Sequence, residues 1–255
     1  MIKLIKSTFY REAATKKRLI RFIQSANQLS FGSECKKFEN GFAQYQGRKY
    51  SVFVNSGSSA NLALIQALLN LGLIKRGDRV GFSAITWSTN VMPLIQLGLE
   101  IVPIDAELDT LNVSSRTLLK CIETYSIKVL FLTNLLGFCG DLDEIYNICK
   151  KKNILLLEDN CESLGTRYKG KNLGNFGLAS TFSFYVGHHL STIEGGMVCT
   201  DDPKLAVMLK LVRAHGWDRN LDASDQEKLK NTFNVKTALQ DRKTYYDNRY
   251  NVRPT

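Results

Sequence analysis

Short apolar runs alternate with segments of helical periodicity along most of this chain, and this alternation constrains the fold more than any other feature. The expected strands are Tyr50–Val54, Arg79–Ser83, Glu100–Ile104, Lys128–Leu132, Ile154–Leu157, Ser180–Phe184 and Gly196–Thr200. The expected helices cover residues 10–27, 34–46, 58–70, 88–97, 114–124, 141–152 and 202–214. Apolar strands separated by helices predict an α/β fold, with a mostly parallel sheet flanked by helices on both faces.

Composition divides the chain into three parts. Residues 1–30 are a helical opening, and residues 31–218 carry the strand and helix pattern of one large domain. The last part, residues 219–255, begins with a polar, charge-rich stretch at 219–248 that lacks a clear apolar stripe. We expect an insertion there.

The charge balance is basic, because 34 Lys and Arg against 24 Asp and Glu give a formal net charge of +10. Such a charge favours anionic partners. The basic residues are scattered and do not alternate with aromatic residues in a cluster, which argues against nucleic acid as a partner. A phosphorylated or nucleotide-linked substrate fits the charge as well as an ordinary basic surface does.

Membrane and metal-binding classes find no support in the sequence. No apolar run approaches the roughly 20 residues that cross a bilayer, and the amino terminus lacks an apolar core followed by a cleavage site. We therefore expect a cytoplasmic protein that does not bind a membrane. The six cysteines show neither C-x-x-C nor C-x-C spacing, so neither a zinc site nor an iron–sulfur cluster is expected.

A pair of adjacent histidines marks the stretch Thr181-Phe-Ser-Phe-Tyr-Val-Gly-His-His-Leu-Ser-Thr-Ile-Glu-Gly-Gly196. Imidazole transfers protons near neutral pH, so His188 is a candidate acid–base residue. A structural polar pair is the alternative interpretation. A metal site is disfavoured, because neither a carboxylate nor a thiol stands at ligand spacing beside the pair.

A turn of small residues, Val54-Asn-Ser-Gly-Ser-Ser-Ala-Asn61, follows an expected strand and opens an expected helix. Free backbone N–H groups at the positive end of a helix dipole bind phosphate, which makes Gly57 and Ser58 candidate phosphate ligands. An ordinary strand-to-helix turn with a capping residue is an equally good reading.

Three further residues are candidates because they stand at or near strand ends. Asp159 closes an apolar run, where α/β proteins bind ligands, and a buried carboxylate needs a cationic partner. Trp87 follows another strand and offers a flat face to a heteroaromatic ring. Taken singly, Asp159 could be a helix cap or part of an ion pair, Trp87 a core residue and Ser183 an ordinary strand serine.

In this order the segments resemble the DegT/DnrJ/EryC1/StrS family of sugar aminotransferases and dehydratases, from about residue 30 to 255. The resemblance implies the large domain of fold type I pyridoxal phosphate enzymes. It assigns the phosphate to Gly57, Ser58 and Ser183, the ring face to Trp87, the ring nitrogen to Asp159, and the region of the ring hydroxyl to Glu162, where the family usually has glutamine. It also places His215 and Arg219 near the substrate, and Asn251 (cofactor) and Arg253 (substrate) in the neighbouring subunit's site, which implies a homodimer.

His188 stands where most of this family carries the lysine that binds the cofactor aldehyde, a bond that imidazole cannot form. Members with histidine here are similar also in Arg213-Ala-His-Gly-Trp-Asp-Arg219. This narrower resemblance implies a lyase that uses pyridoxamine phosphate to remove the 3-hydroxyl of a nucleotide-linked 4-keto-6-deoxy sugar. GDP-4-keto-6-deoxymannose is the implied substrate, glutamate the amino donor, and colitose and O-antigen synthesis the implied setting.

Length leaves several possibilities open. Members of the family continue well past Tyr250-Asn-Val-Arg-Pro-Thr255 into a small domain that closes the site, so we expect either a fragment or a truncated product lacking that domain. An aminotransferase that uses Lys169 or Lys171, a binding subunit and an inactive remnant are the alternatives. A decayed site should also have lost Asp159 or Ser183, and both are present.

Overall fold

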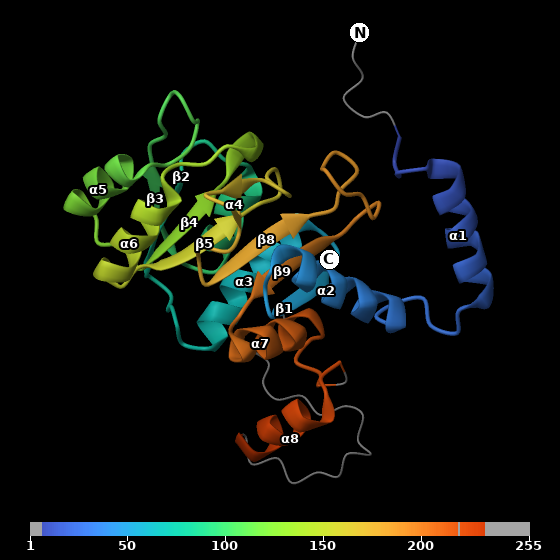
Figure 1. The fold of residues 1–255 in the computed structure, drawn as a ribbon. Coiled ribbons are helices and arrows are strands. Elements are labelled where there is room, and N and C mark those ends of the chain that lie inside the picture. The colour runs from blue at the N-terminus through green and yellow to red at the C-terminus, as the bar shows by residue number, and fades with distance from the viewer. Residues whose placement is uncertain (1–6, 219, 233–255) are drawn as a thin grey trace.

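The computed structural model describes residues 7–218 and 220–232, which build a seven-stranded sheet (Figure 1). Its strands are β1 (Tyr50–Val54), β2 (Arg79–Ser83), β3 (Glu100–Ile104), β4 (Val129–Thr133), β5 (Leu155–Asp159), β8 (Ala179–Ser183) and β9 (Gly196–Thr200). They lie in the order β1-β9-β8-β5-β4-β2-β3. Only β9 is antiparallel to its neighbours in this sheet, so the expected mostly parallel sheet is confirmed.

Helices cover both faces of the sheet. The α-helices of the described residues are α1 (Glu12–Ser25), α2 (Ser33–Gln46), α3 (Gly57–Asn70), α4 (Ser88–Gln96), α5 (Ser115–Thr124), α6 (Leu142–Lys152), α7 (Pro203–Arg213) and α8 (Ala223–Thr232). Side chains of α3, α4 and α7 share a core with Val129 and Phe131 of β4, whereas those of α5 and α6 pack with Leu130 and Leu132. The alternation along β4 shows why the strand is apolar throughout: both of its faces are buried.

The same alternation decides which side chains of β5 reach the site. Leu157 lies in the core beneath α3 and α4, so Asp159, two residues later, points to that face. Glu158 points to the opposite face and is fully buried. Its carboxylate accepts hydrogen bonds from the backbone N–H groups of Gly174, Phe176 and Gly177, at 2.7–2.8 Å. These bonds fasten the loop before β8 to the end of β5.

Two elements differ from the sequence expectations. Helix α8 lies within the segment expected to be an insertion without an apolar stripe, but Leu221 and Leu229 of this region pack against the core shared by α3 and α7. Two apolar residues suffice to anchor an otherwise polar element. The glycine-rich loop after β5 holds a hairpin, β6 (Arg167–Tyr168) and β7 (Lys171–Asn172), because Lys169 and Gly170 both adopt positive φ, at 49° and 81°.

Helix α1 stands apart from the sheet at the amino-terminal side of the molecule (Figure 1), and none of its residues is buried. Leu19, Ile20 and Ile23 of this helix are exposed. Within the described ranges, the helices are all too short or too polar to cross a membrane.

Candidate active site

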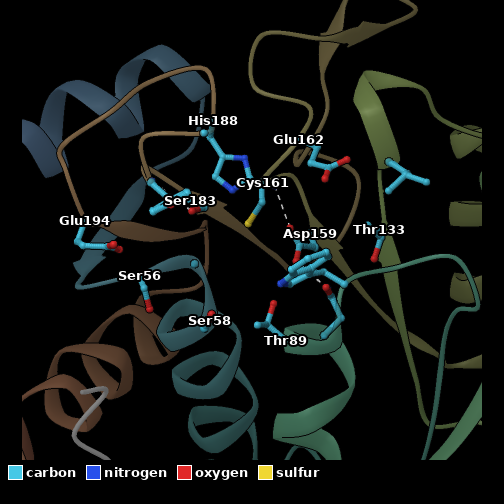
Figure 2. Close-up of a pocket in the computed structure, with 16 residues that line it drawn as sticks. Ser56, Ser58, Thr89, Thr133, Asp159, Cys161, Glu162, Ser183, His188 and Glu194 are labelled. Carbon is cyan, nitrogen blue, oxygen red and sulfur yellow. Dashed lines mark hydrogen bonds between the residues drawn. The ribbon is translucent and has the colours of Figure 1, made fainter. Parts of the chain in front are cut away.

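A cavity of about 400 Å³ lies at the carboxyl ends of the parallel strands (Figure 2). Segments that follow β1, β2, β4, β5 and β8 contribute to it, as expected for an open α/β sheet. The residues that line it are Ser56, Gly57, Ser58, Trp87, Thr89, Asn90, Thr133, Leu135, Asp159, Cys161, Glu162, Ser183, Tyr185, Gly187, His188 and Glu194.

The turn between β1 and α3 forms one wall, where Figure 2 shows Ser56 and Ser58 at the first turn of the helix. Ser56 caps α3 by accepting a hydrogen bond from the backbone N–H of Ser59 at 3.1 Å. A Cβ on Gly57 would lie 2.7 Å from Cβ of Ser183. Glycine is therefore required for the turn to approach β8. This approach brings Ser58, Ser183 and the N-terminus of α3 together in the lining of the cavity. Such a cradle suits a phosphate.

Asp159 lies at the centre of the cavity and is 4% exposed. Its Oδ1 accepts a hydrogen bond from the backbone N–H of Cys161 at 2.9 Å, and its Oδ2 accepts from the side chains of Asn61 and Asn90. Among the described residues, neither Lys, Arg nor His comes within ion-pair distance of this carboxylate. A buried carboxylate without a cation fits a ligand that carries its own positive charge, such as a protonated pyridine ring.

Trp87 lines the cavity at the start of α4 with 72% of its surface exposed. A core role for this tryptophan is therefore wrong. An indole face that borders a polar cavity can cover a flat heteroaromatic ligand.

His188 is half-buried on the side of the cavity opposite α3 (Figure 2). Its backbone N–H donates to the carbonyl of Tyr185 at 2.9 Å, and the two rings pack edge to face with centroids 6.4 Å apart. Burial lowers the pKa of His188 below its ordinary value, although the nearby carboxylates of Glu162 and Asp159 act in the opposite direction. The imidazole is therefore neutral at neutral pH and able to accept a proton.

Lysine is missing from the lining of this cavity, as far as the described ranges 7–218 and 220–232 extend. The two lysines considered for an aminotransferase lie elsewhere: Lys169 pairs with Asp143 at 2.5 Å, and the amine of Lys171 sits 4.6 Å from the ring centre of Phe176. Both are exposed. Neither is placed to bind a cofactor in this cavity.

The remaining sequence candidates are placed unevenly. Glu162 lines the cavity, and its Oε2 accepts a hydrogen bond from the backbone N–H of Leu136 at 3.0 Å. His215 follows α7 with a φ of 60° and is not among the residues that line the cavity, so its proposed contact with the substrate stays a prediction. Arg219, Asn251 and Arg253 lie outside the described residues, and their roles stay predictions.

Asn61 and Asn90, whose side chains donate hydrogen bonds to Asp159, were not predicted from the sequence. One signal existed for Asn61, since it is a polar residue on a helix whose other buried residues are mostly small or apolar. Thr133 was also missed. It ends β4 directly beside Asp159 in the sheet register, and its hydroxyl bonds that of Thr86 at 2.7 Å.

A mostly parallel sheet with a phosphate cradle, an uncompensated carboxylate and an exposed indole at its carboxyl edge defines the fold type I class of pyridoxal phosphate enzymes. Within this class the chain belongs to the DegT/DnrJ/EryC1/StrS aminotransferase family, whose sequence profile matches residues 11–243.

Relatives within the family are similar in sequence and structure. GDP-4-keto-6-deoxy-D-mannose 3-dehydratase of Yersinia pseudotuberculosis is 46% identical over 204 residues, which is 79% of this chain and 52% of that protein. A crystal structure of GDP-4-keto-6-deoxymannose-3-dehydratase with a trapped PLP-glutamate geminal diamine matches with a TM-score of 0.81 and 38% identity, over 87% of this chain and 57% of that one. A histidine-to-asparagine mutant of that enzyme, with bound GDP-perosamine, matches with a TM-score of 0.87 and 36% identity, over 100% and 64%. The chain thus spans about half the length of the curated relatives it matches.

Proposed function

We propose that this protein removes the 3-hydroxyl group of a nucleotide-linked 4-keto-6-deoxy sugar with pyridoxamine phosphate as its cofactor. The observation that carries the proposal is the lining of the cavity. His188 faces the cavity, the buried carboxylate of Asp159 has no described cation beside it, and the described part of the lining contains no lysine. GDP-4-keto-6-deoxymannose is the proposed substrate, because the 46% and 41% identical relatives are named for it.

Each residue has a task that its position supports. Ser58, Ser183 and the first-turn N–H groups of α3 hold the phosphate, and Asp159 holds the ring nitrogen. When bound, the cofactor supplies an electron sink for bond cleavage beside the sugar carbonyl. With the cofactor bound, the imidazole of His188 would serve as the acid–base group, accepting a proton at the carbon next to the ring and returning it to the departing hydroxyl.

Glutamate is the proposed amino donor that restores the cofactor, a choice supported by the PLP-glutamate adduct in a similar enzyme. Aminotransferases remain the second candidate because GDP-perosamine synthase of Caulobacter vibrioides is 33% identical. The absence of lysine among the described lining residues favours the dehydratase. Colitose and O-antigen synthesis and a cytoplasmic location stay predictions.

The test of this function is how the cofactor is held. After incubation with pyridoxal phosphate and reduction with borohydride, we expect peptide mass spectrometry to find no lysine carrying a phosphopyridoxyl group, because His188 cannot form the bond. Incubation with the cofactor, glutamate and GDP-4-keto-6-deoxymannose should yield a 3-deoxy sugar and ammonia. Stoichiometric labelling of one lysine, together with an amino sugar as product, would establish the aminotransferase instead.

A homodimer is part of the proposal. Trp87 lines the cavity with its indole exposed, and Leu136 at 60% and Phe138 at 56% exposure follow the lining residue Leu135 along the chain. Exposed aromatic and large apolar side chains are enriched at protein interfaces. We expect sedimentation velocity to show a dimer that Phe138→Glu weakens, while the matched change Leu119→Glu, on the exposed side of α5, leaves it intact. A monomer at every accessible concentration would contradict a shared site.

A further inference from the structure

Two buried asparagines from neighbouring helices converge on one oxygen of Asp159. Asn90, at the start of α4, donates from Nδ2 to Oδ2 of Asp159 at 2.6 Å, and Asn61 of α3 donates to the same oxygen at 3.1 Å. They are 1% and 0% exposed. The other oxygen, Oδ1, accepts the backbone N–H of Cys161 at 2.9 Å, and the thiol of Cys161 also bonds this carboxylate. Both asparagine amides therefore bind Oδ2, and Oδ1 is the oxygen that they leave to other partners.

The orientation of the Asn61 amide follows from its neighbours. Its NH₂ group donates to Asp159 and also to the carbonyl of Thr89 at 3.2 Å. A flipped amide would place its oxygen against two acceptors, so this orientation is the favourable one. In this orientation Oδ1 of Asn61 is buried without a hydrogen-bond partner among the described residues.

A buried acceptor without a partner lowers stability. Asn61 sits on a helix face where Ala60, Ala63, Leu64 and Ile65 are buried, and an apolar residue of similar size would suit the packing there. The amide of Asn61 therefore does not improve the packing of the core, and its role is the hydrogen bond to Asp159.

We propose that Asn61 and Asn90 are positioning residues that hold Oδ2 of Asp159 and so aim its Oδ1 at the protonated ring nitrogen of the cofactor. Hydrogen bonds donated to a carboxylate are short and strong. They also fix its rotation, because Oδ2 is tied to both helices while Oδ1 is tied to the chain at Cys161. This inference rests on the proposed function, since it requires a pyridine cofactor in the cavity.

The test reads the ring nitrogen directly. Pyridoxal phosphate labelled with ¹⁵N in the ring is bound to the wild-type protein, to Asn61→Leu and to Asn90→Leu, and the ¹⁵N chemical shift is followed against pH. Each variant should lower the proton affinity of the bound ring nitrogen about 10-fold, because Asp159 loses one of the two hydrogen bonds that orient its carboxylate toward that nitrogen. The control is Gln46→Leu, which removes a buried amide that donates to Leu173 outside the cavity. It should leave the ¹⁵N titration unchanged.

The outcomes separate the inference from the function on which it rests. A wild-type protein that binds no cofactor contradicts the proposed function itself. Binding with the same ¹⁵N titration in wild type and both variants overturns the positioning role and leaves the function standing. Where a leucine variant does not fold, the alanine variant of the same residue is read in the same way. Failure of all four variants to fold also overturns the proposal, since the amides would then be structural.

Discussion

His188→Asn is expected to reduce 3-dehydration of GDP-4-keto-6-deoxymannose by about 10²- to 10⁴-fold, the usual contribution of a positioned acid–base group. Asparagine is similar in size and polarity but cannot exchange a proton near neutral pH. Cofactor affinity should change little, because the phosphate and ring contacts come from Ser58, Ser183, Asp159 and Trp87. Turnover is measured as the rate at which the 3-deoxy sugar is formed, and cofactor affinity by fluorescence titration with pyridoxamine phosphate.

Two controls make this result specific. His189→Asn changes the exposed neighbour, which does not line the cavity, and should leave turnover near the wild-type rate. His188→Lys should allow a covalent bond to the cofactor aldehyde and suppress loss of the 3-hydroxyl. Undiminished turnover by His188→Asn would assign the base to another group.

The pH profile gives an independent reading of the same residue. Because burial lowers the pKa of His188, the neutral, proton-accepting form persists below the ordinary value of about 6.5. The rate should therefore fall only when the pH drops below that value, as the imidazole becomes protonated. The residual activity of His188→Asn should lack this fall in rate at acidic pH. A fall in the wild-type rate centred above pH 6.5 would show that the pKa of His188 is not lowered.

Asp159→Asn is the second large effect. A carboxylate buried to this extent and free of any described cation is expected to pair with the ring nitrogen, and breaking a buried ion pair costs about 3–5 kcal/mol. Cofactor affinity and turnover together should fall by about 10²- to 10⁴-fold. Equilibrium dialysis with pyridoxamine phosphate measures the cofactor affinity, and the rate of product formation measures the turnover.

The matched control is Asp143→Asn, which removes the exposed pair with Lys169 outside the cavity. It should alter neither quantity, because exposed ion pairs contribute little. Equal cofactor affinity in wild type and Asp159→Asn would show that another group faces the ring nitrogen.

Local pattern was enough to predict most of the fold. All seven expected strands are present, within about two residues of their expected ends, because burial on both faces makes a parallel strand apolar throughout. The hairpin at Lys169 and Gly170 escaped prediction, since its two-residue turn is recognised only from backbone angles. Helix α8 escaped because it is anchored by a few apolar residues and not by a stripe.

The sequence by itself determined the chemical inventory of the site: a histidine in place of the usual lysine, a strand-end carboxylate, a small-residue turn and a tryptophan after a strand. Tertiary structure decided which of these meet. It joined Asn61 and Asn90 to Asp159 across 98 and 69 residues and brought Gly57 against Ser183. Residue type and spacing report local conformation, whereas these encounters depend on the order of strands in the sheet and on the helices that cross it.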